Sequence, residues 1–304
     1  MTVSYCVTLY NKAEYIATTL AAILSEHRQT GGEIIVYDDC STDASYEIVE
    51  PFAAEGGLRL IRGERNIGLM LATDRLISEA RAPYLKLVDA DDVLQPGSTA
   101  YLRNALRQFS GVIAYGKVLR QSFAKNLSPE GDSATQVRVV PHAFRYFLTR
   151  LPFNVSSSLL ETAAAKAVLP LPGDVRIPQD LVLGLRLARR GKVVETPRLI
   201  AVAPDAPEGH LSRQLAKIYG ESCRIIEEEL GAWGSVRDAA FATRRNARRC
   251  SHYFRREAPA LLGPQDRLWL KLKSVAPPWQ SIASSRKALS HMHTLYRRDE
   301  DRML

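Results

Sequence analysis

Residues 84–92 read Tyr-Leu-Lys-Leu-Val-Asp-Ala-Asp-Asp, and Val-Leu-Gln-Pro-Gly follows at residues 93–97. An apolar run with aromatic and β-branched members ends in a group of carboxylates, and a Pro-Gly pair closes the stretch. This pattern predicts a buried strand that opens into a loop. If Asp89 and Asp91 stay extended, their side chains project to the same side, where both can bind one Mg²⁺ or Mn²⁺ ion. The alternative is an acidic turn that caps the next helix.

Upstream of that stretch, apolar runs alternate with helical patterns. The sequence predicts strands at residues 3–9, 33–37, 58–61 and 84–88. It also predicts helices at residues 13–26 and 69–80, and a third helix that is capped by residues 41–43 and ends at about residue 53. Repeated strand-helix units predict an α/β fold with a mostly parallel sheet covered by helices on both faces. Ligands gather at the carboxyl ends of such strands. Both acidic clusters, Asp38-Asp39 and residues 89–92, follow strand ends.

Downstream, the pattern is mixed at first and purely helical later. Further elements are predicted at residues 98–109, 112–115, 118–123, 141–147, 155–160, 193–194 and 199–202, with a loop at residues 125–136. Pro178 is expected to start a strongly amphipathic helix. From about residue 207 the chain reads as four helices without strands, at residues 211–230, 236–256, 265–274 and 281–297. We therefore expect one α/β domain at residues 1–206 and a helical extension at residues 207–304.

The composition is that of an ordinary globular protein with a large core, because 46% of the 304 residues are hydrophobic and 24% are charged. The four cysteines show no Cys-x-x-Cys spacing, which argues against a zinc site and fits a reducing cytoplasm. No stretch is apolar enough to span a membrane, and the first residues do not resemble a signal peptide. A cytoplasmic protein is expected.

Four motifs in order resemble the family 2 glycosyltransferases, inverting enzymes of the GT-A fold that use nucleotide-sugar donors. They are Leu9-Tyr10-Asn11 after the first strand, residues 38–43 (Asp-Asp-Cys-Ser-Thr-Asp) after the second, residues 65–68 (Arg-Asn-Ile-Gly), and residues 88–92 (Val-Asp-Ala-Asp-Asp). Each motif alone is weak, but their order and spacing together are specific. The resemblance covers roughly residues 1–210.

The resemblance implies a donor site at these strand ends. Tyr10 would line the nucleotide pocket, where its ring can stack on a base, and Asp39 would accept hydrogen bonds from the base or its surroundings. A helix-start charge is the structural alternative for Asp39, although Asp43 suits that position better. The remaining motif residues of the implied nucleotide-sugar site are Asn11, Asn66, Gly68 and Asp89.

The resemblance also implies a divalent metal, Mn²⁺ or Mg²⁺, that bridges the donor diphosphate. Asp91 would be its principal ligand, with Asp89 near the ribose or the water shell of the metal. Gly209-His210-Leu211-Ser212 resembles a late His-x-x-Ser-like element, in which His210 would reach the metal or the diphosphate. A helix cap or a surface position is the alternative for His210.

An inverting transfer needs a base beside the acceptor hydroxyl. In the family this is a carboxylate just before a late amphipathic helix, which makes Asp180 the candidate here; a first-turn helix charge is the alternative. Two departures stand out, because Gln179 replaces the first member of the usual Glu-Asp pair, and Ala72-Thr73-Asp74 stands where many relatives have Ala-Arg-Asn. The Gln-x-x-Arg-Trp motif of processive synthases is absent, so we expect single sugar additions.

The C-terminal region carries the basic surplus, with 18 Lys and Arg against 12 Asp and Glu from residue 205 onward. Arginines crowd one predicted helix, at positions 237, 244, 245, 248, 249, 255 and 256. This helix could contact an anionic membrane, the phosphate of a lipid-linked acceptor or an acidic glycan; a solvated helix face is the structural alternative. Trp269 and Trp279 could be membrane anchors, and core packing is the expected role for both.

Two other classes of function remain to be weighed. A nucleotidyltransferase uses similar physics but would carry a Gly-rich basic phosphate loop after the first strand, which residues 9–12 (Leu-Tyr-Asn-Lys) do not provide. A non-catalytic nucleotide- or glycan-binding relative, or a nucleic-acid binder acting through the arginine-rich helix, is the other alternative. The complete carboxylate set, Asp39, Asp89, Asp91 and Asp180, argues for the enzyme.

Overall fold

The computed structural model describes residues 1–121, 137–150, 153–205, 214–275, 277 and 279–303. These residues group into two compact units. The first unit holds the described residues up to 141 and those between 152 and 205, and the second unit holds residues 142–150 and those after 205. The segment 142–150 therefore groups with the C-terminal helices, although the sequence pattern assigns it to the α/β part.

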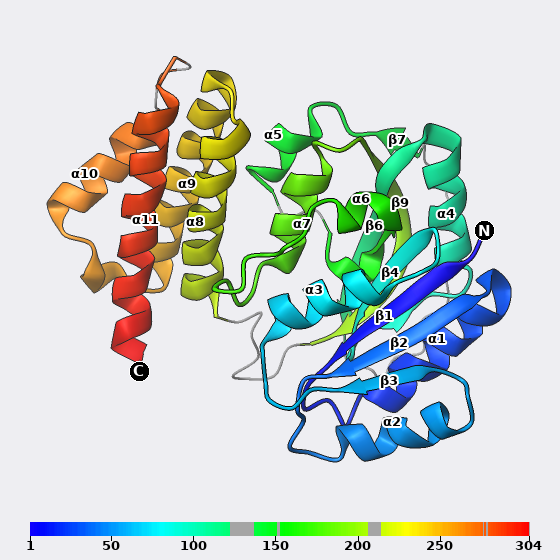
Figure 1. Ribbon diagram of the computed structural model, residues 1–304. Helices are drawn as coiled ribbons and strands as arrows, with labels where there is room; N and C mark the ends of the chain where they lie inside the picture. Colours follow the sequence, from blue (N-terminus) through cyan, green and yellow to red (C-terminus); the bar gives the residue numbers. More distant parts are fainter. Residues whose placement is uncertain (122–136, 151–152, 206–213, 276, 278, 304) are drawn as a thin grey trace. The chain divides into compact units, whose positions relative to one another are not determined.

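The first unit is built on one nine-stranded sheet with the order β3-β2-β1-β4-β8-β6-β9-β5, and β7 pairs with β9 (Figure 1). The strands are β1 (Val3–Leu9), β2 (Gly32–Asp38), β3 (Arg59–Arg62), β4 (Tyr84–Asp89), β5 (Val93–Leu94), β6 (Gly111–Gln121), β7 (Arg138–Val139), β8 (Ser158–Glu161) and β9 (Lys192–Pro204). The pairs β1-β2, β1-β4, β2-β3 and β6-β9 are parallel. The expected α/β fold with a mostly parallel core is confirmed.

Register brings the acidic strand ends together. Leu9 of β1 pairs with Asp38 of β2, and Thr8 pairs with Asp89 of β4. The strands β1, β2 and β4 are almost entirely buried because helices cover both faces, which explains their continuous apolar runs. The segments that follow β1, β2 and β4 therefore meet at one edge, the carboxyl edge of the sheet.

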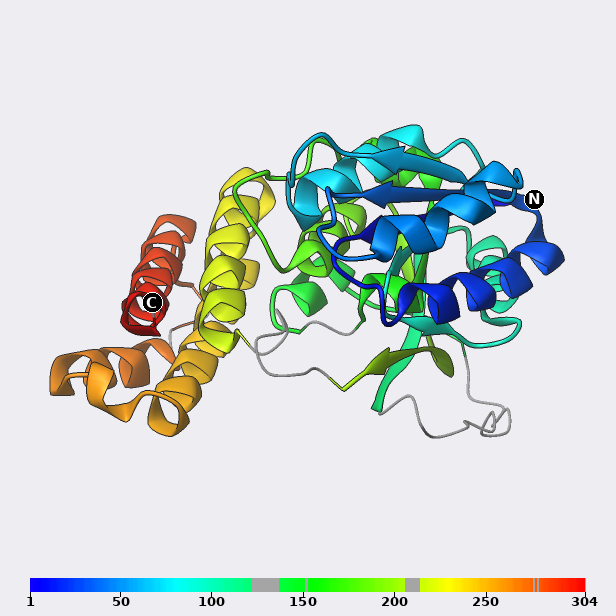
Figure 2. The ribbon, with the colours of Figure 1, turned by 90° about the horizontal axis from the view of Figure 1, so that it is seen from below.

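Helices cover both faces of this sheet (Figure 2). The set α1 (Ile16–Thr30), α2 (Ser45–Ala54) and α4 (Ser98–Phe109) packs together on one face, and α3 (Leu69–Glu79), α6 (Thr162–Lys166) and α7 (Gln179–Leu187) lie on the other. The apolar positions Ile16, Leu20 and Ile23 of α1 are fully buried. They lie at helical spacing and pack into the main core of the sheet.

Two predicted strand breaks are instead irregularities within long strands. Residues 112–115 and 118–121 form the single strand β6, and residues 193–194 and 199–202 belong to the single strand β9. The pairing of β6 with β9 shifts register around Tyr115 and Lys117. Gly116 allows this close approach, because a Cβ there would lie 2.5 Å from the carbonyl oxygen of Arg198.

The second unit is helical, as the sequence predicts. It contains α5 (Ala143–Phe147), α8 (Leu215–Trp233), α9 (Val236–Arg256), α10 (Pro264–Lys273) and α11 (Ile282–Met303). Its core includes an aromatic cluster in which Tyr296 contacts Tyr219, Tyr253 and Phe254. The helix α9 begins with a capping box between Ser235 and Asp238.

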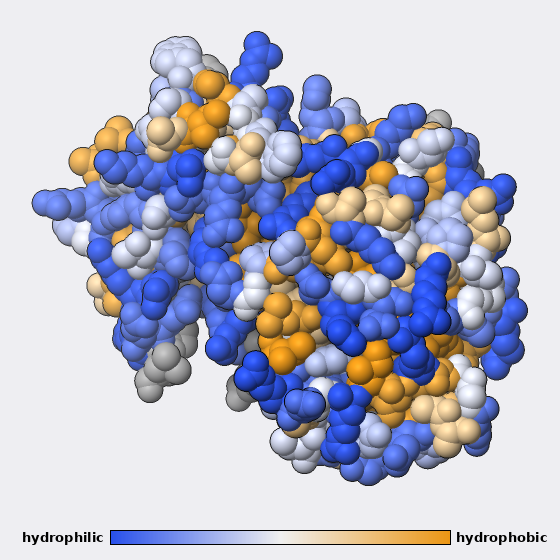
Figure 3. Space-filling view, viewed as in Figure 1, coloured by the Kyte–Doolittle hydropathy of each residue, from blue (hydrophilic) through white to orange (hydrophobic). Residues whose placement is uncertain are grey.

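The surface of the second unit corrects one expectation. Core packing is wrong for Trp279, whose side chain is 78% exposed, whereas Trp269 is half-buried. Hydrophilic residues otherwise dominate the face of this unit seen in Figure 3. Across the described ranges, no helix has both the length and the apolar character required to cross a membrane.

Candidate active site

The loop after β1 is joined to the loop after β2 by Asn11. Its backbone N–H donates to Ser41 Oγ at 3.1 Å, and its side-chain oxygen accepts from the backbone N–H of Thr42 at 2.8 Å. Asn11 has a positive φ of 49°, a conformation that asparagine tolerates better than most residues. The neighbouring Tyr10 leaves 44% of its surface exposed. An exposed aromatic ring therefore stands beside a rigid turn at the carboxyl edge.

Asp39 holds the turn that begins with Asn66. Its two carboxylate oxygens accept the backbone N–H groups of Ile67 and Gly68, at 2.7 and 2.8 Å. Burial raises the pKa of Asp39, although these two hydrogen bonds oppose the rise. Gly68 has a φ of 85°, in the region that favours glycine. The motif around residue 39 and the motif at residues 65–68 thus form one structural element.

Asp43, and not Asp39, serves the start of α2. The Asp43 carboxylate accepts the backbone N–H of Ser45 at 3.0 Å and that of Ala13 at 3.1 Å. Burial raises the pKa of this carboxyl, but hydrogen bonds from Ser45 and Ala13 outweigh it and leave the pKa lowered. The helix-start alternative for Asp39 is therefore not what the structure shows.

The acidic stretch after β4 forms a turn. The strand ends at Asp89, and the backbone N–H of Asp92 donates to the carbonyl of Asp89 at 3.0 Å. Asp89 and Asp91 therefore do not alternate along one extended strand, because this hydrogen bond between residues three apart closes a turn. Asp91 is buried and forms an ion pair with the ammonium group of Lys12.

Asp92 lies behind this turn and is anchored by the segment that precedes β8. Its carboxylate accepts the side-chain amide of Asn154 at 3.0 Å, and Ser156 Oγ accepts the backbone N–H of Asp89 at 2.9 Å. The buried ammonium of Lys86 donates to the carbonyls of Ser156 and Ser158. Burial raises the pKa of Asp92 well above its usual range and lowers that of Lys86 to about 7.

Gln179 brings the start of α7 to the acidic turn. Its amide NH₂ donates to Asp89 Oδ1 at 3.3 Å, and its amide oxygen accepts the hydroxyl of Thr73 at 2.6 Å. Thr73 and Gln179, two of the residues that depart from the family pattern, therefore contact each other. The hydrogen bond between Thr73 and Gln179 joins two neutral side chains at this buried position. The amide NH₂ of Gln179 orients Asp89.

Asp180 follows Gln179 and comes close enough to Asp89 for the two charges to interact. Burial raises the pKa of Asp180 to about 7, and the Asp89 charge adds to the rise. Burial and the neighbouring Asp91 charge likewise raise the pKa of Asp89 to about 7. The guanidinium of Arg120 acts in the opposite direction on both carboxyls. The edge thus gathers more negative charge than Lys12 and Arg120 offset.

The carboxylates at this edge can bind a divalent cation only if water and substrate phosphates complete its coordination. Across the described residues, no group of three or more His, Cys, Asp or Glu side chains is arranged to hold a metal. Mg²⁺ commonly takes one or two protein carboxylates and completes its octahedron with water and substrate phosphates. Asp89 and Asp91 are two carboxylates of that kind, and the pKa of Asp89 is raised chiefly by burial and in addition by the Asp91 charge, which a cation would offset.

The remaining predicted positions are distributed as follows. His210 and the entire loop at residues 125–136 lie outside the described residues. Asp74 accepts the backbone N–H of Leu171 at 2.7 Å, so it braces the chain before α7. Asn66 is exposed at the carboxyl edge.

Two basic residues of the site are not anticipated by the motifs. Lys12 directly follows Asn11, so its position after β1 was a usable signal for a cation at the carboxyl edge. Arg120 lies near the end of β6, and its role depends on the pairing of β6 with β8 and β9. No local pattern indicates that pairing.

Comparison with solved structures identifies proteins that share the fold of this chain. Solved structures with the same fold include S. aureus TarS 1-349 in complex with UDP-GlcNAc, with a TM-score of 0.67, 15% identity, and coverage of 99% of this chain and 92% of that one. Another is the mannosyltransferase PcManGT from Pyrobaculum calidifontis in complex with GDP-Man and Mn²⁺, with a TM-score of 0.59, 14% identity, and coverage of 96% and 86%. At these identities the likeness concerns the fold.

Sequence relatives cover the first part of the chain. The glycosyltransferase GlyG of Streptococcus pneumoniae serotype 4 is 30% identical over 115 residues, which are 38% of this chain and 38% of that protein. The succinoglycan biosynthesis protein ExoO of Rhizobium meliloti is 33% identical over 94 residues, 31% of this chain and 26% of that protein. The chain thus spans well under half of these relatives. Residues 4–154 match the model of glycosyl transferase family 2, and through them the chain belongs to that family.

Proposed function

We propose that this protein is a metal-dependent, inverting glycosyltransferase that moves one sugar at a time from a nucleoside-diphosphate sugar to an acceptor hydroxyl. The observation that carries the proposal is the meeting of Asp89 and Asp180 at the carboxyl edge, each with a pKa raised to about 7. Carboxyls with such pKa values cluster at catalytic sites. The family of residues 4–154 supports the same activity.

The donor would lie across the turn that begins at Asp89. Tyr10 is exposed beside this turn and can stack on the base, and the segment held by Asp39, Asn66 and Gly68 would line the nucleotide pocket. A divalent metal bound by Asp91 and Asp89 would neutralise charge on the leaving nucleoside diphosphate. Lys12 and Arg120 add positive charge beside the same phosphates.

Asp180 would act as the base. It accepts the proton of the acceptor hydroxyl while that oxygen forms a bond to the anomeric carbon, and the bond from that carbon to the diphosphate oxygen breaks. A pKa of about 7 leaves Asp180 both ionised and basic enough near neutral pH. A single displacement, in which the acceptor oxygen attacks on the face opposite the leaving diphosphate, inverts the anomeric configuration. Gln179 contributes by orienting Asp89 without adding another charge.

The comparisons support the substrate class. TarS and PcManGT, which share the fold, are known in complex with UDP-GlcNAc and with GDP-Man and Mn²⁺. ExoO is a succinoglycan biosynthesis protein, and TuaG of Bacillus subtilis is a putative teichuronic acid biosynthesis glycosyltransferase. A nucleotide-sugar donor and an acceptor glycan, free or lipid-linked, in cell-surface polysaccharide synthesis fit these relatives best.

We further propose that the protein works in the cytoplasm and contacts the inner membrane face through α9. Apart from Val236 in the first turn, the exposed residues of this helix form one stripe, composed of Arg237, Phe241, Arg245, Arg248, His252, Arg255 and Arg256. Basic stripes with an aromatic member bind anionic lipid surfaces. Co-sedimentation with vesicles that contain phosphatidylglycerol should be strong at low salt and weaken as salt rises. Absence of binding at low salt would reject this contact.

The activity is tested with a panel of nucleotide sugars in the presence of Mn²⁺ or Mg²⁺. We expect metal-dependent release of nucleoside diphosphate from one donor, and a rise in melting temperature with the corresponding nucleoside diphosphate plus metal. A lack of both effects with UDP, GDP, dTDP and CDP and their sugars would reject the donor site. Donor binding without turnover toward any acceptor glycan would instead favour a non-catalytic binding protein.

A further inference from the structure

A hollow in the second unit, between α10 and α11, is not used by the proposed transfer chemistry. Its volume is about 440 Å³, which is in the range of small-molecule sites. Four of its lining residues come from α10 and four from α11. The lining includes the aromatic ring of Trp269 and the polar or charged side chains of Gln265, Asp266, Lys273, Lys287 and His291. An aromatic side chain can provide contact area for a ligand, and polar groups beside it can fix the orientation of that ligand.

Contacts between the two helices fix one end of the hollow. The Trp269 ring meets the His291 imidazole edge to face, with centroids 4.5 Å apart. The Asp266 carboxylate lies 3.6 Å from His291 Nε2 and 3.3 Å from the Arg298 guanidinium. These contacts hold the Trp269 ring in a defined orientation, so a ligand would meet a preorganised aromatic surface.

The charge in the hollow is positive. Asp266 already faces His291 and Arg298, and Lys273 and Lys287 have no acidic partner within the described part of the chain. The Lys273 ammonium lies 5.9 Å from the centroid of the Trp269 ring. Lysine side chains bind phosphate as compact charges, and two of them match a dianionic phosphate monoester. The hollow thus combines an aromatic surface with an anion site.

We propose that this hollow binds a small phosphorylated ring compound, a sugar phosphate or a nucleotide, with its ring against Trp269 and its phosphate at Lys273 and Lys287. Base or sugar rings gain contact area on an aromatic surface, and the neighbouring ammonium groups attract the phosphate. Gln265 offers a further hydrogen-bonding group for the ring. This site is separate from the donor site of the first unit and does not depend on the proposed transfer activity.

The chain permits a local optical test, because its tryptophans are only Trp233, Trp269 and Trp279. Trp233 and Trp279 are 68% and 78% exposed, so the variant W233F/W279F removes both without disturbing the core. Emission of this full-length variant then reports on Trp269 alone. Glucose 1-phosphate and UMP are titrated, with glucose, uridine and inorganic phosphate as comparisons.

We expect a saturable change in Trp269 emission with glucose 1-phosphate or UMP, and affinities weaker by about tenfold or more for the compounds that lack either ring or phosphate. The tighter of the two phosphorylated probes identifies the ring. No change with either probe, or equal affinity for the neutral rings or for inorganic phosphate, would overturn the proposal.

Two further variants assign the effect to the hollow. K273Q/K287Q should weaken binding by about tenfold or more, whereas K271Q, which alters an exposed lysine of the same helix outside the lining, should leave it unchanged. Equal losses in both variants would overturn the assignment. If W233F/W279F does not fold, calorimetric titration of the wild-type chain and these two variants makes the same comparison. Because no readout involves sugar transfer, failure here leaves the proposed function intact, and the reverse also holds.

Discussion

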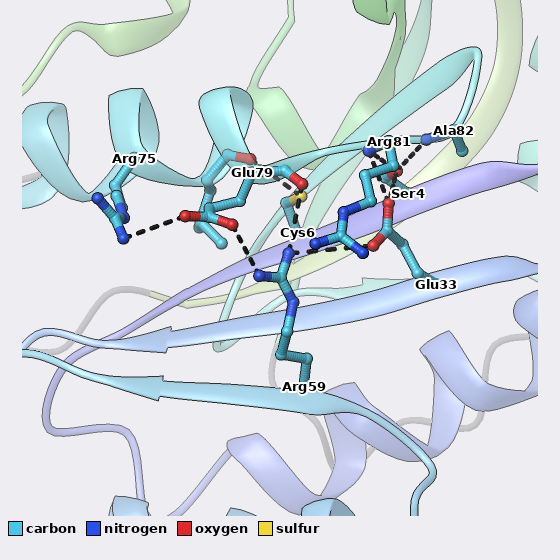
Figure 4. A network of polar contacts seen from close by, with 9 residues as sticks. Ser4, Cys6, Glu33, Arg59, Arg75, Glu79, Arg81 and Ala82 are labelled. Carbon is cyan, nitrogen blue, oxygen red and sulfur yellow. Dashed lines mark hydrogen bonds and ion pairs between the residues drawn. The ribbon is translucent and has the colours of Figure 1, made fainter.

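Charged side chains lie at both edges of the parallel sheet, but their partners differ between the two edges. At the amino edge, where β1, β2, β3 and β4 begin, the acidic groups have basic partners (Figure 4). Glu79 meets Arg59 at 2.7 Å and Arg75 at 3.1 Å, and Glu33 accepts hydrogen bonds from Ser4 and from the backbone N–H of Arg81. Hydrogen bonding to Arg59 lowers the pKa of Glu79.

At the carboxyl edge the balance is opposite. Asp89, Asp92 and Asp180 lie close together, and burial raises the pKa of each. Lys12 pairs with Asp91, and the Arg120 charge offsets only part of the remaining negative charge. The amino edge is thus arranged for stability, whereas the carboxyl edge keeps a cost in stability that a cation and a substrate would relieve.

The largest effect should follow from Asp180→Asn. Removal of a general base reduces turnover by about 10²–10⁴-fold, while donor binding measured by the nucleoside-diphosphate melting shift should change little. Steady-state kinetics at saturating donor provides the measurement. Glu79→Gln, at the amino edge, is the matched control and should retain turnover. Near-normal turnover of Asp180→Asn would remove this residue from the role of base.

Asp91→Asn should act on donor binding. Since this carboxylate is the proposed principal metal ligand, the variant should bind nucleoside diphosphate with Mn²⁺ at least about tenfold more weakly. Calorimetric titration with and without metal measures this loss. A variant that keeps metal-dependent affinity would show that Asp91 serves only as the ion-pair partner of Lys12.

Asp89→Asn should be more stable than the wild type, by an amount that depends on pH, because it removes a buried negative charge. The pKa of Asp89 is about 7 in the folded chain against an ordinary value of 3.8, so the native state binds more protons than the unfolded state between these limits. Native stability therefore falls as pH rises through this window. The variant should gain melting temperature relative to wild type from about pH 4 to about pH 7, with a constant gain above. Melting curves across this range, without metal, decide the point, and a gain that does not grow with pH would contradict the assigned shift.

Much of the sheet could be predicted because its strands carry local signals. The run before Asp89 is apolar because β4 is buried on both faces, and the acidic residues after it stand where the chain leaves the core. In contrast, Gly116 interrupts an apolar run although β6 continues through it. The continuity depends on pairing with β9, which lies far along the chain.

Contacts between residues far apart in the sequence were likewise not predictable at the candidate site. Motif order was sufficient to predict that the segments containing Asp39 and Asn66 lie at one edge, because parallel strands fix that edge. The contact of Gln179 with Thr73 and Asp89 joins residues about a hundred positions apart and has no periodic signal. The sequence also left two arrangements open for residues 89–92, an extended one and an acidic turn, and the structure shows a turn.

The smallest effect is expected from Glu79→Gln, which tests the amino edge. The pKa of Glu79 is lowered from 4.5 chiefly by its hydrogen bond to Arg59, so its contribution to stability is present above about pH 4.5 and is lost as pH falls through the lower folded value. Because Glu79 and Arg59 are partly exposed, we expect a loss of about 0.2–1 kcal/mol near neutral pH.

Chemical denaturation of Glu79→Gln at neutral and acidic pH, at low and high salt, measures this contribution. The loss should shrink at acidic pH and at high salt, since charge on Glu79 and its attraction to arginine produce it. The expected change in stability with pH is opposite in sign to that of Asp89→Asn. The two variants together therefore test whether charge stabilises the amino edge and lowers the stability of the carboxyl edge. A loss that persists undiminished at acidic pH would mean that packing, and not charge pairing, accounts for the stability of the amino edge.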